Sequence, residues 1–117
     1  MKSFQDLNVW KESHFLTLEI YKITKNFPKE ENYGIISQLR RASSSVPANI
    51  AEGMGKNTTK ELLNFIYNAR GSLSETIYHL ILSNDLGYIK EAEFDTLHSR
   101  YNGLAKGVNV FISKLKT

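Results

Sequence analysis

Residues able to do metal or acid–base chemistry are scattered in this 117-residue chain. None of the three histidines stands at a metal-ligand spacing from another. Two groupings come nearest to a site: Glu75 with His79, and Glu91 and Asp95 with His98 on one polar face of a helix. Because the dipole of a helix already favours acids in its first turn, these groupings do not predict a bound metal.

Other catalytic patterns are missing from the sequence as well. No Glu-x-x-His motif for a di-iron bundle is present, and the chain has no cysteine for a thiolate zinc site, a disulfide or a nucleophile. The segment Gly53-Met54-Gly55-Lys56 lacks the spacing of a phosphate-binding loop. No nucleophile–base–orienter set can be assembled. The sequence therefore predicts no enzyme and no catalytic, metal or cofactor-binding residue.

Apolar residues recur every three or four positions, which is the helical period. Four helices are expected, over about residues 6–26, 31–52, 58–85 and 90–115, with the second ending at the glycines Gly53 and Gly55. With short connections between them, these helices predict one all-α domain over residues 1–117, an antiparallel up-down-up-down four-helix bundle.

Several residues mark the helix ends or disturb a helix. Pro47 lies inside the second helix, where it removes the hydrogen bond to the carbonyl of Ser43, so a kink is expected with nearby serine hydroxyls as donors. Thr58 and Glu61 have the spacing of a capping box. Gly87 is suited to a left-handed helix end.

Side chains that depart from the helical pattern indicate a subunit contact. Phe15 and Leu18 fall on the charged side of the first helix, so either the core arc is wide there or they meet a partner. Arg70 falls inside the apolar arc of the third helix, where it either snorkels or pairs, with Glu52 as a candidate partner. Gly103 and Gly107 have a spacing that allows close helix approach.

The second helix carries a polar stripe that is either solvated or part of a polar network: Gln38, Arg41, Ser45, Asn49 and Glu52. We predict that Arg41, Asn49 and Glu52 form a structural polar cluster. The candidate oligomer interface is then Phe15, Leu18, Arg41, Asn49, Glu52 and Arg70.

Charge is mildly basic overall and unevenly distributed. Fifteen basic and 12 acidic side chains give a net charge of +3, which permits a polyanionic partner. Residues 96–117 contain four cations and no acid, whereas residues 85–95 contain four acids and one lysine. This asymmetry fits helix-dipole matching or a functional basic patch.

The candidate nucleic-acid-binding residues are Arg40, Arg41, Lys56, Lys60, Arg100, Lys106, Lys114 and Lys116. Aromatic residues are not obviously interleaved with them, so base-specific readout is not expected.

No apolar run near the N-terminus resembles a signal peptide, and no stretch approaches the ~18 apolar residues of a membrane span. Together with the absence of cysteine, this predicts a cytoplasmic protein that is not inserted in a membrane.

The segment QLRRASSSVPANIAEGMGK, residues 38–56, resembles the signature of the ribosomal-RNA intervening-sequence proteins, a family often encoded inside insertions in bacterial 23S rRNA genes. Further matching features span about residues 5–115 and include Trp10, Tyr21, Phe27-Pro28, Tyr33-Gly34, Phe65, the run 69–75 and the segment 86–89. Ser43 departs from the alanine common in the family and adds a hydroxyl beside Pro47.

The resemblance implies an antiparallel four-helix bundle that assembles as a homopentamer and has no enzymatic activity. Related proteins are accessory factors of diversity-generating retroelements, which work with a reverse transcriptase and its RNA. Two function classes stay open: an oligomeric scaffold that binds RNA or DNA through basic side chains, or an interaction module for another polypeptide. A phosphate-driven complex weakens steeply with salt, which separates the two.

Overall fold

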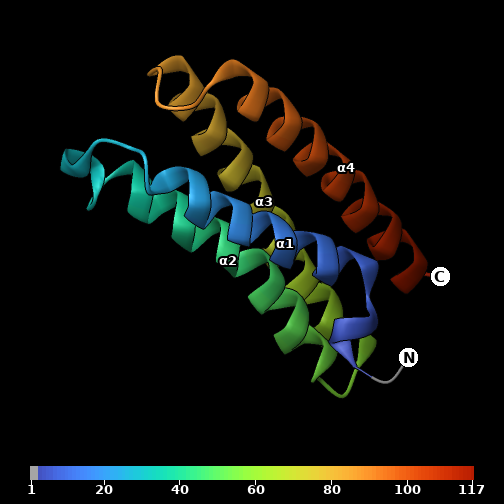
Figure 1. The fold of residues 1–117 in the computed structure, drawn as a ribbon. Coiled ribbons are helices and arrows are strands. Elements are labelled where there is room, and N and C mark those ends of the chain that lie inside the picture. Colours follow the sequence, from blue (N-terminus) through green and yellow to red (C-terminus); the bar gives the residue numbers. More distant parts are fainter. Residues whose placement is uncertain (1–2) are drawn as a thin grey trace.

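A computed structural model describes residues 3–117 and contains four long α-helices. They are α1 (Asn8–Thr24), α2 (Ile35–Met54), α3 (Thr59–Asp85) and α4 (Glu91–Leu115), with short 3-10 turns at Phe4–Asp6 and Lys29–Glu31. Figure 1 shows consecutive helices running in alternating directions, and no strand occurs within residues 3–117. The predicted all-α four-helix bundle is therefore confirmed. None of the helices in this described part is long and apolar enough to cross a bilayer.

The core runs along the axis of the bundle and takes one apolar stripe from each helix. Its fully buried members include Leu16, Ile20, Leu39, Val46, Ile50, Ile66, Leu73, Leu80, Tyr101 and Val108. The predicted start of the second helix at residue 31 is wrong, because Lys29–Glu31 form a separate 3-10 turn. Gly34 then has a non-helical backbone (φ −111°, ψ −117°), and α2 begins at Ile35.

The helix N-cap at Thr58 and the glycine turn at Gly87 are confirmed, whereas the predicted capping box is only half formed, because the Glu61 carboxylate accepts from the Thr58 hydroxyl at 2.9 Å. The Thr58 hydroxyl accepts a hydrogen bond from the backbone N–H of Glu61 at 3.1 Å, as a helix N-cap does. At the other end, Gly87 has a φ of +81°, and the N–H of Tyr88 donates to the carbonyl of Ser83 at 2.9 Å. This pattern satisfies the last carbonyls of α3 and turns the chain toward α4.

Pro47 lies inside α2 without interrupting it. Its missing N–H leaves the carbonyl of Ser43 without a partner inside the helix. Serine hydroxyls were the predicted donors to carbonyls near the proline; those of Ser43 and Ser44 do bond to the carbonyls of residues 40 and 41, but not to the carbonyl of Ser43. The Oγ1 atom of Thr17, on α1, lies 3.0 Å from the Ser43 carbonyl and 2.8 Å from that of Ser13. A buried hydroxyl of α1 therefore compensates for the proline in α2.

Two glycines allow neighbouring helices to approach closely, because they have no side chain. The second helix was expected to end at Gly53 and Gly55; α2 continues through Gly53 to Met54 and has Gly55 as its C-cap. A Cβ at Gly53 would lie 2.8 Å from the Cβ of Phe65, so this glycine allows α2 and α3 to come close. A Cβ at Gly107 would lie 3.3 Å from Val9, whereas one at Gly103 would meet no atom within 4 Å. Close approach therefore occurs at only the second glycine of the predicted pair in α4.

Candidate nucleic-acid interface

Arg70 joins α3 to α4 on the outside of the bundle. Its Nη1 donates to Oδ1 of Asn109 at 3.3 Å, and its guanidinium carbon lies 5.2 Å from the centre of the Tyr67 ring. The side chain is exposed and is not bonded to Glu52, the partner considered from sequence. Because the two helices are antiparallel, this contact sets the first half of α3 beside the second half of α4.

The surface around this contact is basic. Lys106 is exposed and lies on the opposite side of α4 from the buried residues Leu104 and Val108. Asn109 lies toward α3, where it contacts Arg70, and Lys116, the C-cap seven residues later, lies on the same side. Lys114 lines a groove beside α1 together with Leu7, Val9 and Phe111. We define the α3–α4 outer face by its exposed residues Tyr67, Arg70, Ser74, Tyr78, Lys106, Asn109, Ser113 and Lys116.

Carboxylates are missing from the two segments that build most of this face. Residues 62–74 of α3 and residues 96–117 contain no aspartate or glutamate. Arg70, Lys106 and Lys116 therefore have no carboxylate in their own segments, whereas the exposed Glu61 and Glu75 flank the face beside Lys60 and Tyr78. Lys60 extends it, because a residue seven positions before Tyr67 lies on the same side of a helix. Its neighbour at the turn, Lys56, has its ammonium 5.1 Å from the centre of the Phe65 ring.

Two of the predicted nucleic-acid contacts are occupied within the bundle. Arg40 donates from Nε to Oγ1 of Thr24 at 2.9 Å and lies 4.7 Å from the centre of the Tyr21 ring, so it ties α2 to α1. Arg100 donates to both carboxylate oxygens of Glu12, at 2.7 and 3.0 Å. These pairings lie on other sides of the bundle from the α3–α4 outer face, so the eight predicted cations do not form one patch.

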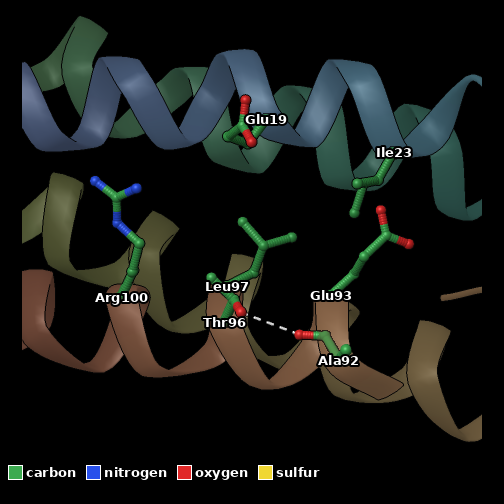
Figure 2. A pocket seen from close by; sticks show the side chains of 7 residues that line it. All are labelled: Glu19, Ile23, Ala92, Glu93, Thr96, Leu97 and Arg100. Carbon is green, nitrogen blue, oxygen red and sulfur yellow. Dashed lines mark hydrogen bonds between the residues drawn. The ribbon is translucent and has the colours of Figure 1, made fainter. Parts of the chain in front are cut away.

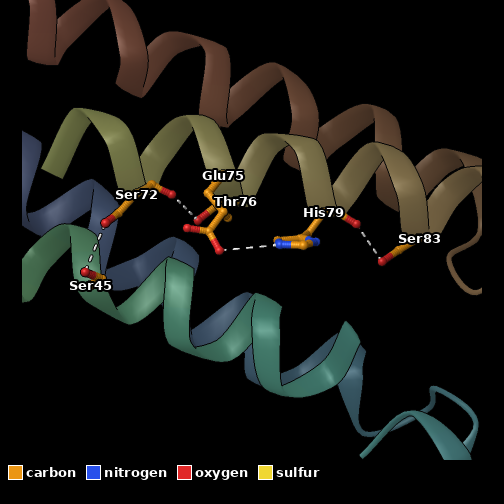
Figure 3. A network of polar contacts seen from close by, with 6 residues as sticks. All are labelled: Ser45, Ser72, Glu75, Thr76, His79 and Ser83. Atoms are coloured by element: carbon orange, nitrogen blue, oxygen red, sulfur yellow. Dashed lines mark hydrogen bonds and ion pairs between the residues drawn. The ribbon is translucent and has the colours of Figure 1, made fainter. Parts of the chain in front are cut away.

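A polar surface cleft of about 420 Å³ lies along the α2–α3 contact and is lined by Gln38, Arg41, Ser72 and Glu75. The hydroxyl of Ser72 donates to Ser45 at 3.0 Å, which joins the two helices (Figure 3). The remaining contacts around the cleft are an Asn49 amide that donates to the Ser45 hydroxyl at 3.0 Å and a Glu75–His79 pair at 3.5 Å.

The predicted cluster of Arg41, Asn49 and Glu52 is therefore incomplete inside one chain. Asn49 is bonded to Ser45, whereas the exposed side chains of Arg41 and Glu52 make no hydrogen bond or ion pair within residues 3–117. A second chain can still complete it, so the cluster stays a prediction.

The seam between α1 and α4 is hollow along its length. Figure 2 shows one hollow of about 270 Å³, lined by the apolar Ile23 and Leu97 and by the charged Glu19, Glu93 and Arg100. Two further hollows follow beside Val9 and Gly107. On the outer edge of this seam, Phe15 and Leu18 are 41% and 49% exposed, so they lie outside the core arc.

No group of three or more metal-ligating side chains converges in residues 3–117. The His98 ring stacks on Phe94 at 5.0 Å. The most strongly perturbed phenol belongs to Tyr101, where burial raises the pKa well above its ordinary value of 10.0 and the charge of Glu12 adds to the rise. That phenol lies in the core, without a hydrogen-bond partner in residues 3–117.

Exposed tyrosines are the part of this surface that sequence reasoning missed. Tyr67 and Tyr78 lie on the α3–α4 outer face, 37% and 56% exposed. Their separation of eleven residues, three turns of helix, was the signal available in the sequence. Asn109 gave no such signal, because its partner Arg70 is 39 positions away.

Comparison with known proteins defines the family. The family model of the 23S rRNA-intervening sequence proteins matches residues 5–110. A similar solved structure is that of a protein of unknown function from the S23 ribosomal protein family of Bacteroides thetaiotaomicron. It is 24% identical, with a TM-score of 0.79 over 93% of this chain and 99% of that one, a likeness that shows the fold alone. No curated protein matches. Because the family model spans nearly its whole length, this chain belongs to the 23S rRNA-intervening sequence protein family.

Proposed function

We propose that this protein is a non-catalytic, homo-oligomeric protein that binds RNA or DNA through the α3–α4 outer face. The observation that carries the proposal is the arrangement of Arg70, Lys106 and Lys116 on segments without a carboxylate. Phosphate oxygens are the natural partners of such cations, and these contacts dominate nucleic-acid affinity. Nothing in the site points to catalysis.

Binding through these cations is weak and strongly dependent on salt. Each phosphate contact releases condensed counterions, so the logarithm of the affinity falls by about 0.7 per contact and per decade of salt for a single strand. Three to five contacts therefore cost about two to three and a half decades of affinity for each tenfold rise in salt.

The test is a fluorescence anisotropy series with a labelled 20-nucleotide RNA between 50 and 200 mM salt. We expect the double variant Lys106→Glu/Lys116→Glu to bind more weakly and with a shallower salt dependence. Its matched control is Lys25→Glu/Lys29→Glu, which makes the same change of charge at exposed positions at the opposite end of the bundle. Absence of binding at 50 mM salt, or equal weakening by both variants, contradicts the proposal and leaves a polypeptide partner as the alternative.

The oligomer is proposed from exposed apolar side chains on α1. Phe15 and Leu18 stand on the outer edge of the bundle, and the guanidinium carbon of Arg100 lies 4.3 Å from the centre of the Phe15 ring. A ring of subunits needs two different faces in contact, and this edge supplies one of them. The family resemblance implies five subunits.

A further inference from the structure

The two exposed tyrosines of α3 lie on one side of that helix. Tyr67 and Tyr78 are eleven residues apart, so their directions differ by about 20° around the axis and their positions by about 16 Å along it. Between them stand Gly71 and Ser74, both exposed. A Cβ at Gly71 would meet no atom within 4 Å, so the surface between the two rings is open.

Each ring is held by a neighbour without being covered completely. The guanidinium carbon of Arg70 lies 5.2 Å from the centre of the Tyr67 ring, and the His79 ring meets Tyr78 edge-on at 5.4 Å. Arg70 is held in turn by Asn109 of α4. Because the guanidinium lies over one face of the Tyr67 ring, a nucleobase can stack on the outer side of this pair.

The cations lie at one end of this aromatic row and beside it. Lys60 precedes Tyr67 by two turns on the same side of α3, and Lys106 and Lys116 line the adjoining side of α4. A strand that follows α3 can therefore place its phosphates against lysines while its bases turn toward the rings. Two aromatic rings that are this far apart engage different bases of one strand.

We propose that Tyr67 and Tyr78 are stacking sites for the bases of a single-stranded nucleic acid, so that the protein prefers a single strand to a duplex. This inference rests on the proposed function and adds the class of nucleic acid. In a duplex the faces of the bases are already stacked on one another, so a tyrosine on the outside of a helix has no free face to engage. The lysines contact either form.

The experiment compares a 20-nucleotide uridine strand with a 20-base-pair RNA duplex by anisotropy at 100 mM salt. We expect the single strand to bind more tightly although the duplex carries about twice as many phosphates. Tyr67→Ala and Tyr78→Ala should each weaken single-strand binding by at least about fivefold, the lower limit for the loss of one stacked base. Duplex binding and the salt dependence should stay unchanged.

Three further variants make the test specific. Tyr67→Phe and Tyr78→Phe should bind like the wild type, because stacking uses the ring and not the hydroxyl. Tyr33→Ala is the matched control, since Tyr33 is fully exposed in the loop before α2. It should leave single-strand binding unchanged.

The outcomes separate this inference from the proposed function. Salt-dependent binding with no preference for the single strand, or with no effect of the tyrosine variants, overturns the stacking sites and leaves the basic face standing. If the tyrosine variants change the oligomer mass in light scattering, the rings belong to a subunit contact. This result also overturns the inference. Absence of binding to either RNA at 50 mM salt overturns the inference and the proposed function together.

Discussion

The Tyr101 hydroxyl is a polar group buried in the core without a hydrogen-bond partner in residues 3–117. Leaving such a group unpaired costs about 1–3 kcal/mol, because water satisfied it in the unfolded chain. The ring itself fills the space between the helices and packs with Leu104 and Val108. The hydroxyl therefore opposes the stability that the ring provides.

Tyr101→Phe should raise the free energy of unfolding by about 1 kcal/mol at pH 7, as measured by urea denaturation. Burial raises the pKa of this phenol in the folded state, so above pH 10 the unfolded chain loses a proton that the folded chain keeps. The free energy of unfolding of the wild type should consequently fall as the pH rises above 10, and that of Tyr101→Phe should fall less over the same range. A variant less stable at pH 7 would show that the hydroxyl has a partner.

Thr17 supplies a hydrogen bond that Pro47 cannot. Thr17→Val keeps the volume of the side chain but leaves the Ser43 carbonyl without its donor, so the free energy of unfolding should fall by about 1–3 kcal/mol. Thr96→Val is the control, because the exposed Thr96 hydroxyl bonds only to Ala92 of its own helix. Equal losses in the two variants, compared by thermal denaturation, would argue against a special role for the α1–α2 bond.

Glycines inside helices have opposite effects according to what faces them. Gly103→Ala should raise the free energy of unfolding by about 0.5–1 kcal/mol, since its Cβ meets no atom and alanine is the better helix former. Gly53→Ala should lower it by about 1–3 kcal/mol, because its Cβ would be forced against Phe65 and α3 would have to move. Urea denaturation of both variants measures the difference. Stabilisation by both would mean that α2 and α3 separate easily.

Signals that act within a few residues predicted the elements well. The Thr58 cap and the Gly87 turn depend only on neighbours in sequence, and both are present. The start of α2 was misplaced, because three residues after Pro28 form their own turn. The helical period also predicted that Phe15 and Leu18 lie outside the core stripe, and both side chains are exposed in the structure.

Contacts between helices set the limit of sequence reasoning at the candidate site. From the sequence, Arg40 and Arg100 were interpreted as free cations. In the structure their partners Thr24 and Glu12 lie on α1, 16 and 88 positions away. Arg70 was predicted to lie in a subunit contact. Its hydrogen bond to Asn109 could not be predicted, because it depends on how α4 packs against α3. The helical period predicts on which side of its helix a residue lies, but not which residue of another helix it contacts.

The assembled molecule should depend on the outer edge of α1. Phe15→Glu should reduce the light-scattering mass from that of a pentamer to that of one 13.4 kDa chain, because the contact would lose an apolar ring and bury a carboxylate beside Arg100, which is already paired with Glu12. Helicity by circular dichroism should stay unchanged, since Phe15 lies outside the core. Tyr33→Glu serves as the control. A wild-type mass of one chain at micromolar concentration contradicts the oligomer, and a dimer or tetramer contradicts the count of five.

The hollows along the α1–α4 seam also affect how the bundle opens. Surface hollows interrupt the packing along this seam, so moving α4 away from α1 alone exposes less newly wetted apolar surface than separating the more closely packed α2 and α3. Local opening then costs less free energy than global unfolding. Backbone amides of α4 should exchange with deuterium sooner than those of α2. The C-terminal helix would therefore move as a hinged unit, carrying Lys106 and Lys116 with it.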